Sequence, residues 1–184
     1  MCIRDSPYTS ELAKEKVLEL AHIMTKFCGR MTVDIVGFTE IQEAIRDHCR
    51  EEYFTIIMRR FMMRIAEAIG RDHGAKCLVT GENLGQVASQ TMDAMAVTGA
   101  VVHMPIFHPL IGMDKEEIVT VARRIGTLET SIPVSYTHLC AVAALDALLG
   151  IPFRNRNGNA ALLISGSAQL ELAVDMIDER GRCV

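Results

Sequence analysis

The segment from Leu78 to Thr91, LVTGENLGQVASQT, constrains the fold of this chain more than any other. Residues 77–79 form a short apolar run, residues 80–82 break it with small and polar groups, and Gly85 permits a tight turn. This order predicts a buried strand, a turn and the start of a helix. In open parallel α/β sheets, ligands bind beyond the carboxyl ends of strands, where backbone N–H groups and helix N-termini favour negative charge. The segment is therefore the first candidate for a ligand site.

The helix expected from Gln86 onward carries polar side chains along one stripe, formed by Gln86, Ser89, Gln90 and Asp93. Such a stripe of amides and a hydroxyl beside a glycine turn suits a nucleotide. An ordinary strand-to-helix connection with a solvated helix face explains the same pattern equally well.

The rest of the chain alternates between helical and extended patterns. Apolar periodicity predicts helices over Thr9–Phe27, Thr39–His48, Phe54–Ile69, Gln86–Val97 and Asp114–Ile125, and strands over Met31–Phe38, Lys76–Thr80 and Val101–Met104. Asp114 is expected to cap the helix that follows it. Strands that alternate with helices predict a parallel sheet covered by helices.

Arg59 stands out in the helix expected over residues 54–69, which is apolar nearly all round. Arg60, Arg64 and Glu67 share a stripe that we expect to reach water, whereas the neighbours of Arg59 along the helix are Ile56, Met62 and Met63. A buried arginine needs an anionic partner. Phosphate would match its guanidinium. The alternatives are a structural ion pair with a carboxylate such as Glu82, or a side chain that reaches solvent.

Composition limits the classes of function. The 184 residues fit one domain, and they contain neither a signal-peptide pattern nor an apolar run long enough to span a membrane. The net charge of −4 argues against a broad nucleic-acid surface within this segment but leaves a local basic patch open. The six cysteines are scattered without a C-x-x-C pair and have no histidines at zinc-ligand spacing, so we expect reduced thiols, no metal site and a cytoplasmic protein.

Four segments of the chain resemble one known family, the tRNA 4-thiouridine synthases. They are PYTSELAKEKVLELA, YFTIIMRRFMMRIAEAI, LVTGENLGQVASQT and PLIGMDKEEIVTVARRIGTLETS, and the resemblance is nearly continuous from Pro7 to Ile132. It implies an α/β fold with a parallel sheet and helices on both faces, of the PP-loop ATP pyrophosphatase (adenine-nucleotide α-hydrolase-like) type. The sheet would be incomplete in this chain.

The resemblance also implies a function. Members of the family are ATP-dependent tRNA sulfurtransferases, which also deliver sulfur for the thiazole of thiamine. The cofactor implied is ATP with Mg²⁺, and the partners are tRNA and a cysteine desulfurase. The family's ATP contacts correspond to Arg59, Gly81 and Gln90. Asp114 and Lys115 lie in another family motif, but Asp114 is interpreted first as a helix cap.

The chain departs from the family pattern in three respects. The nucleotide loop Ser-Gly-Gly-x-Asp-Ser and the RNA-binding module are expected upstream of Pro7. The family's cysteine is expected after Ile132, and Cys140, in the context LCAVAAL, is not assigned that role. No catalytic residue is therefore assigned. The chain alone could be a nucleotide-binding fragment without catalysis, or a different ATP-pyrophosphatase relative.

An open sheet edge predicts aggregation or a homodimer, which a clean monomer in gel filtration would contradict.

The two ends of the resemblance look alike. MCIRDS at the start and VSYTHL at residues 134–139 resemble translated adapter sequence. We therefore expect three parts: a partial catalytic domain over 7–132, an artefactual join over 133–139 and an unassigned α/β segment over 140–184. A genomic read that runs unchanged through the join would refute this division.

The segment over 140–184 nevertheless has protein-like patterns. It predicts a helix over Ala141–Leu149, a strand over Ala160–Ser165 and a helix over Ala168–Glu179. Ser165-Gly166-Ser167 follows the strand but lacks the second glycine and the aspartate of a PP-loop. A small-residue turn explains it better than a phosphate site.

Overall fold

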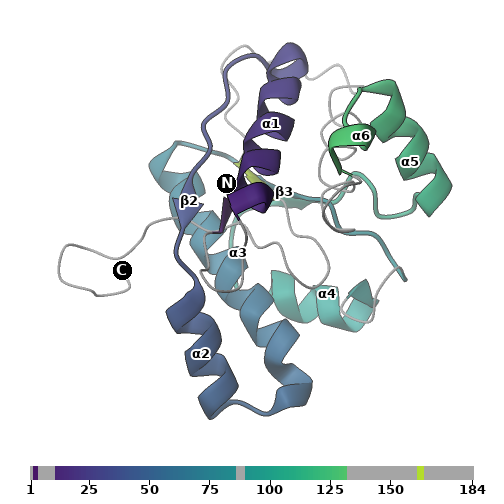
Figure 1. Cartoon of the computed structure of the whole chain (residues 1–184). Coiled ribbons are helices and arrows are strands. Elements are labelled where there is room, and N and C mark those ends of the chain that lie inside the picture. Colours follow the sequence, from purple (N-terminus) through teal and green to yellow (C-terminus); the bar gives the residue numbers. More distant parts are fainter. Residues whose placement is uncertain (1, 4–10, 86–89, 132–160, 164–184) are drawn as a thin grey trace.

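The computed structural model describes residues 2–3, 11–85, 90–131 and 161–163 (Figure 1). In chain order the elements are β1 (Cys2–Ile3), α1 (Glu11–Cys28), β2 (Ile35–Val36), α2 (Thr39–His48), the 3₁₀ turn η1 (Glu51–Tyr53), α3 (Phe54–Asp72), β3 (Leu78–Thr80), α4 (Met92–Gly99), β4 (Ile106–Phe107), α5 (Lys115–Arg124), α6 (Leu128–Ser131) and β5 (Ala161–Leu163).

The strands form two small parallel sheets. One contains β1 and β2, and the other has the order β4-β3-β5, with β3 in the centre. Strand β3 is followed by α4 and then by β4, the parallel crossover expected from the alternating pattern. The α/β class with a parallel, helix-covered sheet is confirmed. No helix among the described residues is long and apolar enough to cross a membrane.

Helix α3 is the central element of the core (Figure 1). On one side Met58, Met62 and Ile69 pack with Phe38 and with Ile45 of α2. On the other side, Met63 and Ala66 pack against Leu78 of β3. The apolar surface of α3 is buried on both sides, as its sequence predicts.

One expectation about α3 is wrong. Arg64 is exposed, but Glu67, expected on the same water-facing stripe, is only 8% exposed. Its Oε1 accepts hydrogen bonds from the backbone N–H groups of His103 and Met104, at 2.7 and 2.8 Å, and from Arg71 at 3.0 Å. Periodicity could not reveal this burial, because the donors lie 36 and 37 residues away along the chain.

The same contact explains why no strand forms over residues 101–104. The backbone N–H groups of His103 and Met104 bind Glu67, so they are not available to a neighbouring strand. The strand instead forms at Ile106–Phe107, and Val101, Val102 and Met104 pack against the core from a loop. The strand expected over Met31–Phe38 is likewise shortened, to Ile35–Val36.

The ends of two helices test the capping predictions. Helix α4 begins at Met92 and not at Gln86, because Thr91 has an extended backbone and its side chain caps the N–H of Ala94. Residues 86–89 lie outside the described part. Asp114 caps α5 as expected, in a reciprocal capping box with Glu117 at 2.7 and 2.8 Å.

Strand β5 comes from the segment over 140–184 and confirms the strand predicted at Ala160–Ser165. It pairs in parallel with β3, so that Val79 lies opposite Leu162 and Thr80 opposite Leu163. The helices predicted over Ala141–Leu149 and Ala168–Glu179 and the turn at 165–167 lie outside the described residues.

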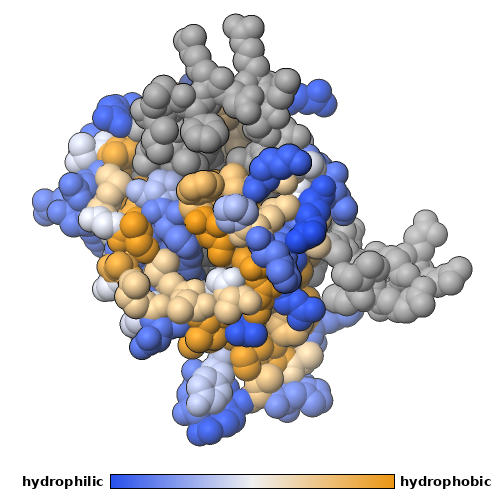
Figure 2. Space-filling view, turned by 180° about the vertical axis from the view of Figure 1, so that it is seen from behind, coloured by the Kyte–Doolittle hydropathy of each residue, from blue (hydrophilic) through white to orange (hydrophobic). Residues whose placement is uncertain are grey.

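Some large apolar side chains remain on the surface. Met92 of α4 is 68% exposed and Phe107 of the edge strand β4 is 49% exposed. On the face seen in Figure 2, apolar surface is bordered by hydrophilic side chains. An edge strand with an exposed aromatic ring is typical of a sheet that can pair further.

Ending the chain after Ile132 should destabilise the fold, because it removes β5 and opens one edge of the buried strand β3. We expect the melting temperature to fall by about 4 °C or more, with increased aggregation. A chain that ends after Ile164 retains β5 and is the control. Equal melting temperatures for the two shortened chains would show that β5 contributes nothing.

Candidate functional site

Polar side chains are buried together where β3 ends. Thr80 is fully buried, Glu82 and Asn83 are each 3% exposed, and Gly81 is buried between them. Buried polar groups are costly unless they are paired. Their concentration just beyond the carboxyl end of a central parallel strand marks the position where α/β proteins bind ligands.

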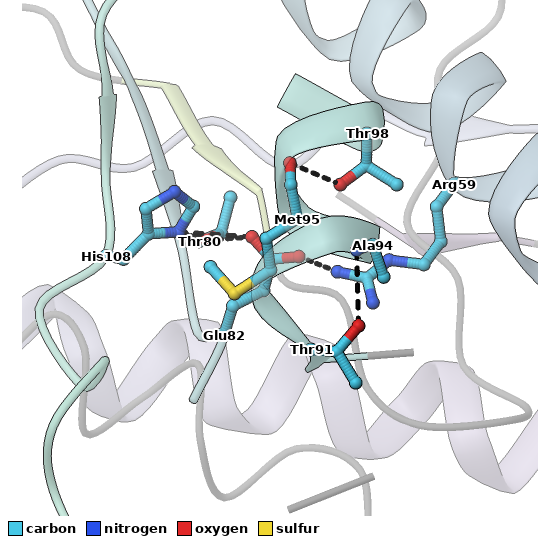
Figure 3. Close-up of polar contacts among 8 residues, drawn as sticks. All are labelled: Arg59, Thr80, Glu82, Thr91, Ala94, Met95, Thr98 and His108. Atoms are coloured by element: carbon cyan, nitrogen blue, oxygen red, sulfur yellow. Dashed lines mark hydrogen bonds and ion pairs between the residues drawn. The ribbon is translucent and has the colours of Figure 1, made fainter. Parts of the chain in front are cut away.

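Arg59 reaches this site from α3 (Figure 3). Its side chain is 9% exposed and forms an ion pair with Oε1 of Glu82. Burial lowers the pKa of Arg59. The structure thus contains the ion pair with Glu82 that the sequence offered as the alternative to phosphate. Because a guanidinium presents several N–H groups in a fixed plane, one carboxylate partner does not exclude a second anion.

The other carboxylate oxygen of Glu82 is held from two strands. The Thr80 hydroxyl donates to Oε2 over 2.8 Å, and Nδ1 of His108 lies 3.1 Å from the same oxygen. His108 follows β4, and its Nδ1 is also 2.5 Å from the Thr80 hydroxyl oxygen. Glu82 therefore joins α3, β3 and the end of β4 (Figure 3).

The contacts of His108 determine which of its ring nitrogens carries the proton. A carboxylate only accepts hydrogen bonds, and the Thr80 proton is already directed to Glu82. The hydrogen must therefore reside on Nδ1 of His108, which leaves Nε2 as the acceptor in the neutral ring. Burial, together with the positive charge of Arg59, lowers the pKa of His108, which favours this neutral form at pH 7.

The loop after β3 is tied down by further hydrogen bonds. The Asn83 amide donates to the carbonyls of Leu110 and Met113, and the Leu84 N–H donates to Ile111 over 3.2 Å. These bonds fix residues 82–84 against the segment that leads to α5. Neither the residue pattern nor the family resemblance identifies Asn83 as a site residue. Its position directly after Glu82 in the turn beyond the strand could have indicated it.

Gln90 lies beyond the glycine turn. Gly85 has a φ of +79°, the left-handed conformation that glycine tolerates, and its N–H donates to the Gln90 carbonyl over 3.2 Å. The Gln90 side chain is 6% exposed, and its Oε1 has no hydrogen-bond partner in the described part of the chain. Buried acceptors usually receive a hydrogen bond, so this oxygen is a candidate acceptor for a donor group of a ligand.

The predicted site residues occupy one region. Arg59 contacts Glu82, the neighbour of Gly81, and the Gly85 N–H connects the same loop to Gln90. His108 was missed because the sequence places the strand at Val101–Met104, whereas His108 directly follows the strand that forms at Ile106–Phe107. Asp114 is engaged in capping α5. Among the described residues, no cluster of histidines, cysteines and carboxylates could hold a metal ion.

The sequence matches the family described as "Thiamine biosynthesis protein (ThiI)" over residues 1–147. The chain belongs to this family. The ThiI relatives include a probable tRNA sulfurtransferase of Acetivibrio thermocellus, 57% identical over 136 residues, which cover 74% of this chain and 34% of the relative. One from Clostridium acetobutylicum is 52% identical, with 74% of this chain and 35% of the relative covered.

A solved structure agrees with this assignment. The chain is similar to a 4-thiouridine synthetase crystallised in complex with RNA and bound ATP, with a TM-score of 0.67 and 40% sequence identity. The match covers 71% of this chain and 34% of the synthetase. The chain thus spans about a third of the length of the proteins that it matches.

Proposed function

We propose that this chain is part of an ATP-dependent tRNA sulfurtransferase that forms 4-thiouridine and also supplies sulfur for the thiazole of thiamine. The curated relatives are named probable tRNA sulfurtransferases, and the similar solved structure is a 4-thiouridine synthetase. The proposed substrate is tRNA, the proposed sulfur donor is a cysteine desulfurase, and the proposed location is the cytoplasm.

The observation that carries the ATP assignment is the buried Oε1 of Gln90, which has no hydrogen-bond partner among the described residues and follows the Gly85 turn in the loop that begins at Glu82. An acceptor of this kind suits an N–H or O–H donor of adenine or ribose. Arg59 would bind a phosphate group, and the backbone around Gly81 would approach the nucleotide. The similar structure contains ATP, and Mg²⁺ is proposed to accompany it here.

The proposed reaction has two stages. ATP adenylates the C4 oxygen of a uridine with loss of pyrophosphate, which converts that oxygen into the good leaving group AMP. The terminal sulfur of a cysteine persulfide then displaces AMP, and a second thiol attacks the resulting S–S bond, which releases 4-thiouridine and leaves a disulfide. The residues of this chain would bind ATP and hold its α-phosphate near the base, so their contribution is positioning and charge neutralisation.

For the chain alone we propose nucleotide binding without sulfur transfer. The nucleophile in such a transfer is a thiolate. Burial raises the pKa of Cys28 to about 11 and also raises that of Cys77, which disfavours the thiolate form at both positions. Cys77 moreover precedes β3, at the end of the strand opposite to the site.

We propose a homodimer through the exposed strand edge, which gel filtration would test.

Activity can be tested by exchanging the segment into a complete relative. Residues 7–132 would replace the corresponding part of the Acetivibrio thermocellus protein, and the product would be assayed for 4-thiouridine with ATP and a sulfur donor. We expect activity from the hybrid and none from the chain alone. Loss of at least about tenfold is expected when the hybrid carries Arg59→Lys. A folded hybrid that binds tRNA but forms no 4-thiouridine would contradict the proposal.

A further inference from the structure

The Arg59–Glu82 pair differs from an ordinary structural ion pair in how its carboxylate is held. Oε1 of Glu82 faces Arg59, while Oε2 is bound by Thr80 at 2.8 Å and approached by His108 at 3.1 Å. Donors from two strands thus fix the carboxylate. Glu82 is 3% exposed and Thr80 is fully buried, so water does not replace these contacts.

A carboxylate that is held on one oxygen can orient whatever binds the other. The Arg59 side chain is long and flexible, and its position on α3 does not by itself set the plane of the guanidinium. The plane matters because N–H groups donate along fixed directions, so a small rotation removes a hydrogen bond to phosphate.

We propose that Glu82, anchored by Thr80 and His108, is the positioning residue that sets the orientation of Arg59 for binding the phosphate of a nucleotide. This inference rests on the proposed function, since it takes the phosphate of ATP as the ligand of Arg59. Glu82 does not touch the nucleotide in this arrangement and acts through Arg59. Thr80 and His108 act one contact further away.

The test compares ATP with adenosine, because only the phosphates depend on Arg59. Dissociation constants of the full-length chain for both ligands would be measured by calorimetry, and the ratio between them reports phosphate binding. Glu82→Asp retains the negative charge but withdraws the carboxylate by one methylene. We expect it to lower the preference for ATP about tenfold, with adenosine affinity unchanged.

Two comparisons separate positioning from general damage. Arg59→Lys should lower the same ratio, and the double variant Glu82→Asp/Arg59→Lys should be no worse than Arg59→Lys alone. Glu67→Asp is the matched control, since Glu67 is also a buried carboxylate that pairs with an arginine, Arg71, but it contacts the loop before β4 and not the site. It should leave the ratio unchanged.

Each outcome decides one claim. A wild-type chain without preference for ATP, or a ratio untouched by Arg59→Lys, would overturn the proposed phosphate site and the positioning role with it. A ratio lost in Arg59→Lys but kept in Glu82→Asp would overturn positioning alone, as would an equal loss of ATP and adenosine binding. If Glu82→Asp does not fold, Thr80→Val replaces it. A smaller loss of the preference for ATP over adenosine in Thr80→Val supports the proposal, and a preference equal to that of the wild type overturns it.

Discussion

Replacing Arg59 with methionine is expected to destabilise the fold by about 3–5 kcal/mol, because it leaves the carboxylate of Glu82 buried without its counter-charge. The Thr80 and His108 contacts remain, but neither carries a full positive charge when His108 is neutral. The measurement is the free energy of unfolding from urea denaturation at pH 7.

The double variant Arg59→Met/Glu82→Leu distinguishes a buried unpaired charge from a loss of packing. Removing both charges should restore most of the stability lost in Arg59→Met, because paired buried charges contribute little net stability relative to apolar residues of similar size. The restored protein should still fail to distinguish ATP from adenosine. If the double variant is instead less stable than Arg59→Met, the ion pair is not the reason for the cost.

Replacing Glu67 with glutamine should lower the free energy of unfolding by about 1–3 kcal/mol at pH 7 and by much less in acid. Burial alone would raise the pKa of Glu67. Hydrogen bonds from Arg71 and from the backbone N–H groups of His103 and Met104 outweigh this effect and lower the pKa to about 2. Because this folded-state pKa lies below the ordinary value of 4.5, the stabilisation is complete above pH 4.5 and is lost as the pH falls toward 2.

The difference between wild type and Glu67→Gln isolates this contribution. Protonation of His108, whose pKa is also lowered, begins to destabilise both proteins as the pH falls below its ordinary value of 6.5. That effect cancels in the difference, which should narrow only below about pH 4.5. Glu52→Gln removes an exposed partner of Arg50 and should change stability by less than about 1 kcal/mol. If the difference in unfolding free energy between wild type and Glu67→Gln stays constant from pH 7 to pH 3, the proposed role of Glu67 is contradicted.

The candidate site could be predicted from the sequence where the signal was local. The apolar run before Thr80, the tight turn at Gly85 and the capping by Asp114 depend on neighbouring residues, and the structure has all three. The start of α4 was misplaced because Thr91, which caps it, also fits a continuous helical stripe.

The buried polar groups show the limit of such arguments. The same helix pattern predicts burial for Arg59, which is buried, and exposure for Glu67, which is not. The difference comes from the loop before β4, whose N–H groups reach Glu67 only after the chain has crossed from β3 through α4. The spacing of residues along the sequence cannot predict this contact between distant segments.

The sequence by itself determined the parallel α/β class, the strand-turn segment at residues 78–85 and the choice of Arg59 as a buried cation, because hydrophobic periodicity and turn chemistry act over a few residues. Only the tertiary structure decided that Glu82 is the partner of Arg59, that Thr80 and His108 hold Glu82, and that β5 lies beside β3. These contacts join residues from separate elements, and their energies depend on distance in space and on burial, which packing alone establishes.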